Sequence, residues 1–178
     1  MPNRPTEGFS LQDPGPRSLE YLAGVFDGEG CITFTKAKKD HVLNWEAGLA
    51  PKILMDSTHQ DTIKAFHERF GGHMYERKPR NPKHRAGWAW ALHTKDGVRN
   101  FVETMEPLLH TKRPQAEAVL MFFTTIRKGS VRGQPLPPET CLIRRLCYNK
   151  IRQANKGLWD NLNTYVGHGT HSAAIQPR

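Results

Sequence analysis

Two acidic residues, Asp27 and Glu29, stand two positions apart in the stretch LAGVFDGEG, which covers residues 22–30. Each acid is followed by a glycine, and both lie at the end of a short apolar segment that begins after Ser18, a residue type that often caps helices. The C-terminus of a helix carries a partial negative charge, which repels carboxylates. The position of these acids is therefore unfavourable for the stability of the helix, which indicates that they have another role.

The composition favours a polyanionic partner. Twenty-six lysines and arginines against seventeen acidic residues give a formal net charge of +9 and a pI near 9.7. This charge suits nucleic acid or an acidic membrane surface better than a small neutral ligand. No apolar run approaches the roughly 20 residues of a membrane span, and residues 1–17 lack the apolar block of a secretory signal. We therefore expect an intracellular protein without a membrane partner.

The cysteines and histidines indicate neither a disulfide framework nor a zinc site. Cys31, Cys141 and Cys147 are an odd number without paired spacing, so we expect reduced, mostly buried thiols. The nine histidines show no paired Cys/His spacing in company with further ligands, so no zinc site is assigned.

The periodicity of the apolar residues predicts one α+β domain in which helices alternate with pairs of strands. Ser57 and Gln60 have capping-box spacing at the start of the second helix, and the glycines after Phe70 end it. The first seven elements follow the order αββαββα, and two C-terminal helices come after them. The expected elements are a helix from 18, strands at 31–36 and 43–53, a helix ending at 70, strands at 73–78 and 87–93, and helices at 98–105, 114–128 and 139–155.

The two strand pairs are expected to form one antiparallel sheet with an apolar face under the helices and a polar face open to a partner. The predicted core face carries Ile32, Phe34, Trp45, Leu49, Trp88, Trp90 and Leu92. The predicted open face carries Thr33, Thr35, Asn44, Glu46, Lys52, Glu76, Lys78, Ala89, Ala91 and His93. A curved polar sheet of this kind can enter the DNA major groove and read base edges, although a merely solvated face is the alternative.

Basic residues gather in the loops beside this face, and the basic run ERKPRNPKHR is the densest group. It plausibly grips DNA phosphates, the alternative being an ordinary solvated loop. The DNA-contacting residues expected in the loops are Lys38, Arg77, Lys78, Arg80, Lys83 and Arg85. The last helix is also basic, with apolar Leu142, Ile143, Leu146 and Ile151. It is expected to contact the DNA backbone, to pack through its apolar stripe, or to do both.

The stretch LAGVFDGEG closely resembles the nonapeptide that names the LAGLIDADG homing endonucleases. The αββαββα order matches the core of that family, and EPLLHTKRPQAEAVL resembles its later helix entry, in which a lysine precedes a Q-A pair. The resemblance covers about residues 18–127 and contains one copy of the motif. It implies a curved four-stranded antiparallel DNA-binding sheet and a metal-dependent endonuclease. It also implies double-strand breaks at a long, partly palindromic target, made by a homodimer.

The resemblance also assigns roles to residues of the motif. Glu29 matches the metal-binding acid, and the backbone carbonyl near Gly28 is expected to complete a site for Mg²⁺ or Mn²⁺ with phosphate oxygens and water. Lys112 matches the basic catalytic residue, although a surface lysine on a DNA phosphate is an equal alternative. For Asp27, a structural role is as plausible as ligation. The polar residue near the end of the second strand stays unassigned among Lys52, Met55 and Asp56.

In single-motif members the motif helix of one subunit packs against that of the other. The small residues Ala23 and Gly24 would let the two backbones approach closely. The expected dimer interface consists of Leu22, Ala23, Gly24, Phe26 and Asp27.

The sequence leaves further alternatives open. An intron RNA maturase, with intron RNA as a possible partner, or a non-cleaving DNA-binding regulator could use the same fold. The expected compartment is a bacterial or phage cytoplasm, or a mitochondrion or chloroplast for an organellar intron. The expected divisions are a flexible segment (1–17), the endonuclease domain (18–127), a basic helical extension (128–159) and a flexible tail (160–178).

Overall fold

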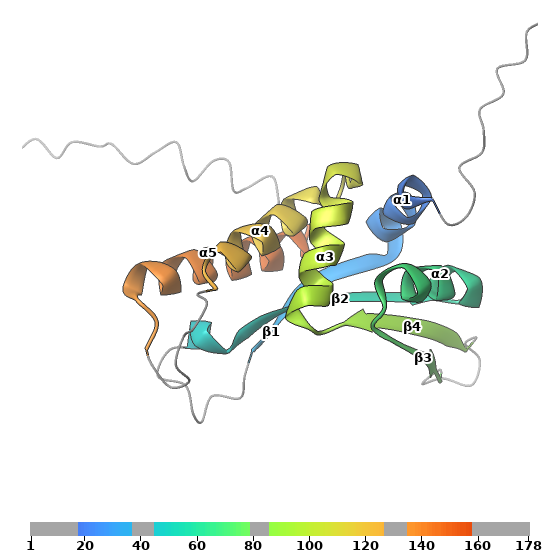
Figure 1. Cartoon of the computed structure of the whole chain (residues 1–178), viewed down its shortest axis with the longest axis horizontal. Helices are drawn as coiled ribbons and strands as arrows, with labels where there is room; N and C mark the ends of the chain where they lie inside the picture. The colour runs from blue at the N-terminus through green and yellow to red at the C-terminus, as the bar shows by residue number, and fades with distance from the viewer. Residues whose placement is uncertain (1–17, 37–44, 79–85, 127–134, 158–178) are drawn as a thin grey trace, which may run out of the picture.

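The computed structural model describes residues 18–36, 45–78, 86–126 and 135–157, and within them it shows five α-helices and a four-stranded sheet (Figure 1). The predicted α+β class and the αββαββα order are confirmed. The elements are α1 (Leu19–Glu29), β1 (Gly30–Lys36), the short 3-10 helix η2 (Trp45–Gly48), β2 (Leu49–Ser57), α2 (Gln60–Phe70), β3 (His73–Arg77), β4 (Gly87–Leu92), α3 (Lys95–Met105), η3 (Glu106–Leu108), α4 (Arg113–Thr124) and α5 (Pro138–Ala154).

The sheet is antiparallel with the strand order β1-β2-β4-β3, and the helices gather on one of its faces (Figure 1). Because successive residues of a strand point to opposite faces, alternate residues enter the core. The core side chains from the strands are Ile32, Phe34, Leu49, Ile53, Met55, Trp90 and Leu92. None of the described helices covers the opposite face of the sheet, which is called the open face below.

Aromatic side chains join the helices to the sheet. The ring of Phe26 on α1 meets that of Phe101 on α3 edge-on at 4.8 Å, and the ring of Trp90 lies 5.2 Å from that of Phe66 on α2. The indole Nε1 of Trp90 donates to the carbonyl of Gly71 at 2.7 Å. Gly71 has a φ of 68°, a conformation that favours glycine, and it ends α2 as the sequence predicts. Trp90 is therefore a core residue, as predicted, and not a base-stacking platform.

The predicted N-terminal cap is confirmed for α1 but not for α2. Ser18 caps α1 as expected, because its hydroxyl accepts a hydrogen bond from the backbone N–H of Tyr21 at 3.2 Å. The capping box predicted for α2 is wrong: Ser57 is the last residue of β2, and His59 precedes the helix without a side-chain cap. The Ser57 hydroxyl accepts from the N–H of His59 instead.

The second predicted strand begins later than expected. Residues 45–48 form η2, and the strand runs over β2 only. Glu46 is consequently not on the open face but buried, and Arg145 of α5 donates to its carboxylate from Nε at 2.9 Å. The expectation that Glu46 contacts DNA is therefore wrong.

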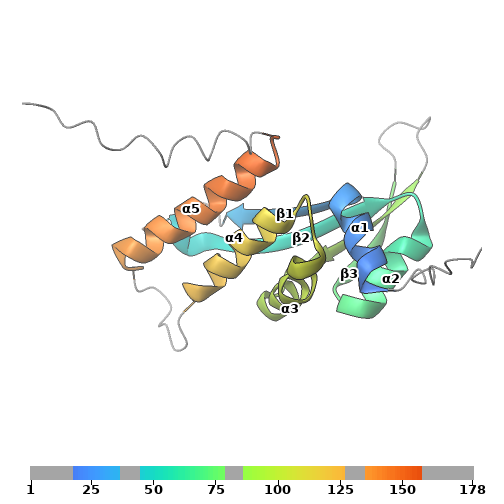
Figure 2. The same cartoon turned by 90° about the horizontal axis from the view of Figure 1, so that it is seen from above.

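Helix α5 packs beside α4 (Figure 2). Its buried positions are Thr140, Arg144, Cys147 and Ile151, whereas Leu142 and Leu146 of the predicted apolar stripe are more than half exposed. Arg144 enters the core side because Nε donates to the Thr125 hydroxyl at 2.8 Å. Burial raises the pKa of the Cys147 thiol to about 11, which fits the expected reduced, buried thiol.

Several predicted DNA contacts and both predicted flexible ends lie outside the described residues. These contacts are Lys38, Asn44, Arg80, Lys83 and Arg85. Within the described part of the chain, the longest apolar stretch of helix falls short of what a membrane crossing requires.

Candidate active site and nucleic-acid interface

The carboxylate of Asp27, near the C-terminus of α1, organises the loop that leads into α4. Its Oδ2 accepts a hydrogen bond from the backbone N–H of His110 at 2.7 Å, and its Oδ1 accepts one from the N–H of Lys112 at 2.9 Å. Both carboxylate oxygens are thus used to hold a segment more than eighty residues away in the sequence. Of the two roles left open for Asp27, the structure supports the structural one.

Lys112 returns to the same helix end. Its ammonium Nζ donates to the backbone carbonyl of Asp27 at 2.6 Å. A cation at this position compensates the partial negative charge of the helix C-terminus. Asp27 and Lys112 therefore join α1 to the start of α4 through two sets of hydrogen bonds, at a point two residues before Glu29.

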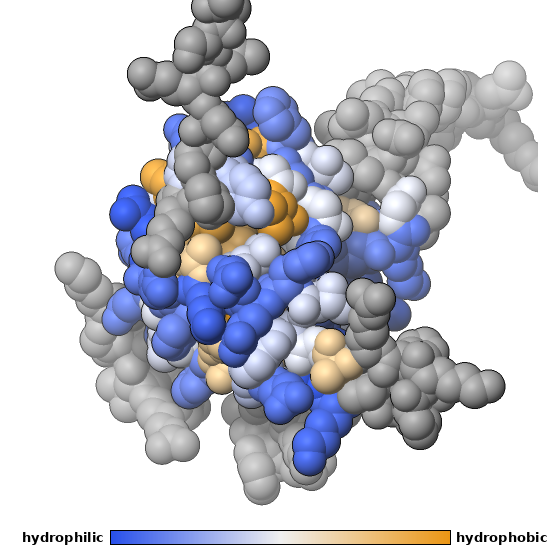
Figure 3. All heavy atoms as spheres, turned by 90° about the vertical axis from the view of Figure 1, so that its right-hand side faces the viewer, coloured by the Kyte–Doolittle hydropathy of each residue, from blue (hydrophilic) through white to orange (hydrophobic). Residues whose placement is uncertain are grey.

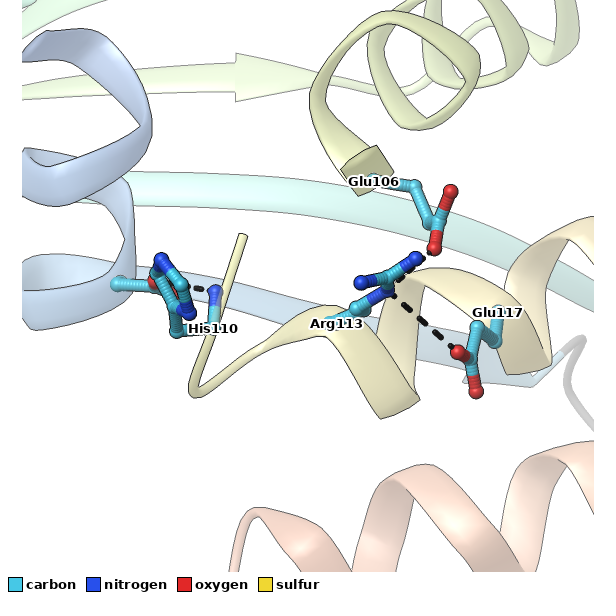
Figure 4. A network of polar contacts seen from close by, with 5 residues as sticks. Glu106, His110, Arg113 and Glu117 are labelled. Carbon is cyan, nitrogen blue, oxygen red and sulfur yellow. Dashed lines mark hydrogen bonds and ion pairs between the residues drawn. The ribbon is translucent and has the colours of Figure 1, made fainter. Parts of the chain in front are cut away.

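A separate charged group fixes the first turn of α4 (Figure 4). The guanidinium Nε of Arg113 lies 2.7 Å from a carboxylate oxygen of Glu106 and 3.7 Å from one of Glu117. Because Lys112 directly precedes Arg113, these contacts also restrict the backbone at the lysine.

Glu29 differs from Asp27 in having no such partners. It is the last residue of α1, it is exposed, and no described residue forms a hydrogen bond or ion pair with its carboxylate. Gly28 is exposed beside it and lies within the helix, which ends at Glu29 with Gly30 as its C-cap.

These groups fit a hard divalent cation. A carboxylate and a backbone carbonyl are oxygen donors of the kind that Mg²⁺ or Mn²⁺ takes. The described residues contain no cluster of three or more His, Cys, Asp or Glu able to hold a metal ion alone. By the chemistry of their oxygen atoms, Glu29 and the Gly28 carbonyl fit a cation whose remaining ligands would be phosphate oxygens and water.

Asp56 lies at the end of β2 next to this helix terminus. Gly30 pairs with Met55 in the antiparallel sheet. Glu29 directly precedes Gly30 and Asp56 directly follows Met55, so both residues lie at the same end of this strand pair. Met55 is buried in the core, and Lys52 lies four residues further along β2. Of the three residues left open for the polar role, Asp56 is the one beside Glu29.

The thiol of Cys31 lies among these charges. Burial raises its pKa, Lys112 opposes the rise and Asp56 adds to it. The fields of Lys112 and Asp56 therefore both reach the side chain that follows Gly30. The structure brings Glu29, Lys112 and Asp56 to one end of the sheet. The sequence indicated Asp56 only as one of three candidates near the end of the second strand.

Asp56 also carries an ion pair that the sequence did not indicate. Arg77, at the end of β3, donates from Nη1 to its Oδ2, and both side chains are more than half exposed. Arg77, expected as a phosphate contact, thus lies on the open face close to this end of the sheet.

The surface of α1 differs from the expected dimer interface. Leu22, Ala23 and Phe26 are buried in the core of the same chain, so their assignment to the interface is wrong. The exposed side of the helix presents Gly24, which belongs to the predicted interface, and Gly28. Apart from their chain neighbours and the backbone of α1, no described residue has an atom within 4 Å of the position that a Cβ would occupy on either glycine. Figure 3 views the end of the molecule that carries α1 and α2, and shows apolar surface beside hydrophilic side chains there.

The open face of the sheet is polar, as predicted, but its residues on β3 differ. Glu76 pairs with Trp88, so it lies on the same face as the core tryptophans, and its predicted place on the open face is wrong. Tyr75, which pairs with Ala89, and Arg77 lie on the open face instead. Lys78 follows the end of β3 and is exposed.

The remaining predicted residues of this face lie where the register places them. Thr33 pairs with Lys52, and Thr35 pairs with Ala50, whose carbonyl accepts a hydrogen bond from the Thr35 hydroxyl at 3.2 Å. His93 follows β4 and is exposed.

No protein-family model and no curated protein sequence matches this chain. Solved structures do match. The homing endonuclease I-CvuI, in complex with the I-CreI target in the presence of Mg, superposes with a TM-score of 0.59 at 16% identity, covering 85% of this chain and 96% of that one. The homing endonuclease I-TnaI gives a TM-score of 0.54 at 17% identity, over 79% and 97% of the two chains. The LAGLIDADG homing endonuclease I-GzeII with its DNA target gives 0.55 at 12% identity, over 90% and 53%.

The chain has the LAGLIDADG homing endonuclease fold. The resemblance seen in LAGVFDGEG is confirmed at the level of architecture, since the motif forms α1 and leads directly into the first strand of the sheet. The chain spans nearly the whole of I-CvuI and I-TnaI but about half of I-GzeII. Within this LAGLIDADG fold, the end of the motif helix carries both Glu29, its last residue, and the contact between Asp27 and Lys112.

Proposed function

We propose that this protein is a site-specific DNA endonuclease that uses a divalent metal and makes double-strand breaks as a homodimer. The observation that carries the proposal is the end of α1, at the margin of an open polar sheet. There Glu29 is exposed and has no partner among the described residues, and Lys112 contacts the carbonyl of Asp27 two residues before it. I-CvuI and I-GzeII, which have this fold, were solved with DNA targets. The net charge of +9 supports the same partner.

The residues at this end of the sheet divide the work of phosphodiester hydrolysis. Glu29 and the Gly28 carbonyl hold the cation, which when bound activates water and stabilises charge on the scissile phosphate. Lys112 supplies a positive charge for the developing oxyanion, and its bond to the Asp27 carbonyl fixes its approach. Asp56 orients water beside Glu29, and Arg77 restrains the direction of its carboxylate.

The proposed homodimer follows from the number of active-site acids that one chain supplies. One chain carries one motif and therefore one Glu29, whereas cutting both strands requires an active site on each. The exposed Gly24 and Gly28 allow close approach of a second α1, because no side chain of the described residues covers them. Two such chains related by a two-fold axis would prefer a partly palindromic target.

Replacing Glu29 tests the proposal. Glu29→Gln keeps the size of the side chain but removes its charge, so we expect cleavage of a selected target to be lost while DNA affinity changes little. The matched control is Glu20→Gln, an exposed acid in the first turn of the same helix, which should cut like the wild type. The target is obtained by cleavage selection from a randomised duplex library with Mg²⁺.

Three results would contradict parts of this proposal. A Glu29→Gln protein that cuts normally removes the metal role of this residue. A wild-type protein that binds DNA but yields no cleaved product in the selection is a DNA-binding regulator. An association constant for DNA that does not fall as salt concentration rises argues against any nucleic-acid ligand. Contact with six or more phosphates requires a slope of about −5 or steeper when the logarithm of this constant is plotted against the logarithm of salt concentration.

A further inference from the structure

A cluster of protonatable side chains lies on the open face, away from the proposed active site. It consists of Lys52 on β2, His73 at the start of β3 and His93 just after β4. Ile53 pairs with Leu92, so Lys52 and His93 are the next residues along the two strands. The imidazole rings of His73 and His93 have their centroids 6.0 Å apart.

The surroundings of the cluster keep it accessible to a ligand. The neighbouring open-face positions on β4 are Ala89 and Ala91, whose methyl groups do not rise above the sheet, and both histidines are exposed. The exposed His93 is partly shielded from water by its neighbours, which lowers its pKa below the ordinary value of 6.5, and the charges of Lys52 and His73 lower this pKa further. Among the described residues, these two are the charged groups whose field shifts His93.

We propose that Lys52, His73 and His93 form a proton-coupled contact for a DNA phosphate, in which at least one imidazole takes up a proton from solvent when DNA binds. This inference rests on the proposed function. In the free protein, the positive charges beside His93 favour its neutral imidazole. A phosphate over the cluster reverses this balance, because a nearby negative charge favours the protonated imidazole.

The position of the cluster fits a contact with the flank of a target and not with the cleaved bond. Lys52 lies four residues along β2 from Asp56, which is about 13 Å at 3.3 Å per residue. Successive base pairs rise about 3.4 Å, so this distance corresponds to about four base pairs from the phosphate held at Glu29. Protonation of the cluster therefore changes DNA affinity without changing the groups that act on the scissile phosphate.

The experiment is a series of binding titrations by fluorescence anisotropy. The probe is a fluorescein-labelled duplex of mixed sequence, about 30 base pairs long, without divalent metal and at constant ionic strength between pH 5.5 and 8.5. We expect affinity to rise as pH falls between the pKa of the DNA-bound imidazole and the lower pKa of the free one. The rise approaches about tenfold per pH unit for each proton taken up.

Variants separate the cluster from other protonation events. His93→Gln and His73→Gln should each flatten the pH dependence and converge on the wild-type affinity at high pH. The matched control is His67→Gln, which alters an exposed histidine of α2 on the helical side of the sheet and should keep the wild-type slope. NMR titration of the imidazole resonances should show a higher pKa for His93 in the DNA complex than in the free protein.

Two results overturn the inference and differ from each other. Wild-type binding that is independent of pH, or an unchanged slope in both His93→Gln and His73→Gln, refutes the proton-coupled contact while DNA binding stands. No binding of the duplex at any pH or salt concentration refutes the proposed function itself, and the inference with it.

Discussion

The pair of hydrogen bonds at Asp27 allows a test of how α1 is joined to α4. In Asp27→Asn, one carboxylate oxygen becomes an NH₂ group that meets a backbone N–H, either that of His110 or that of Lys112. At that position the hydrogen bond is lost, because the new NH₂ group and the backbone N–H are both donors. The second hydrogen bond remains but is weaker, because its acceptor no longer carries a negative charge. We expect this substitution to lower stability and also the rate of DNA cleavage, because Lys112 loses its fixed position.

The magnitude follows from the strength of such bonds. A hydrogen bond to a charged group contributes roughly 1.5–3 kcal/mol, and Asp27 is half-buried, which favours the lower end of that range. We therefore expect Asp27→Asn to lower the free energy of unfolding by about 2 kcal/mol. For a chain of this length each kcal/mol corresponds to about 2–4 °C, so the melting temperature should fall by about 4–8 °C.

Circular dichroism during thermal and urea unfolding measures both quantities. The matched control is Asp61→Asn on α2, whose carboxylate is 97% exposed and lies 3.7 Å from the ammonium of Lys64. An exposed pair of this kind contributes little, so this variant should unfold within about 0.5 kcal/mol of the wild type. An Asp27→Asn protein as stable as the control would refute the idea that Asp27 holds the loop.

Two further substitutions test the α1 surface and the buried acid. Gly24→Leu has free space around its Cβ and improves helix propensity, so the monomer should be at least as stable as the wild type. Sedimentation should nevertheless show loss of the dimer, and cleavage assays should show loss of double-strand cutting. A variant that still dimerises contradicts the proposed interface. Burial acts to raise the pKa of Glu46, but hydrogen bonds and charge from Arg145 lower this pKa overall. The ionised carboxylate therefore stabilises the fold at pH values above its ordinary pKa of 4.5, and this stabilisation is lost as pH falls through the lowered pKa. Glu46→Gln should therefore lower the free energy of unfolding by roughly 1.5–3 kcal/mol at pH 7, with the difference shrinking in urea titrations below pH 4.5; a difference that stays constant down to pH 3 contradicts this.

Local signals in the sequence predicted most of the fold. Apolar residues at helical spacing located the helices, Ser18 marked the start of α1, and the glycine pair after Phe70 marked the end of α2. These features depend on groups a few residues apart, so they are visible in the sequence alone. The acids of the motif and Lys112 were also recognisable, because their spacing resembles that of a known family.

The errors arose where distant contacts decide the structure. Trp45 and Ala47 continue the alternation of the following strand, but Glu46 between them bonds to Arg145, ninety-nine residues away, and the segment forms η2 instead. The face of β3 was wrong for a related reason. A shift of one residue in strand pairing moves every side chain to the opposite face, and the alternation of β3 alone does not set the register that places Tyr75 on the open face.

The two acids of the motif helix resolve their unfavourable position in different ways. The charge of Asp27 is balanced by two backbone N–H groups, and the ammonium of Lys112 lies on the carbonyl of the same residue. Glu29 receives no such contact from the described residues, although it stands closer to the end of the helix. The fold therefore satisfies one acid internally and leaves the other available. An exposed carboxylate at a helix C-terminus lowers its electrostatic cost when it binds a cation, which is the role proposed for Glu29.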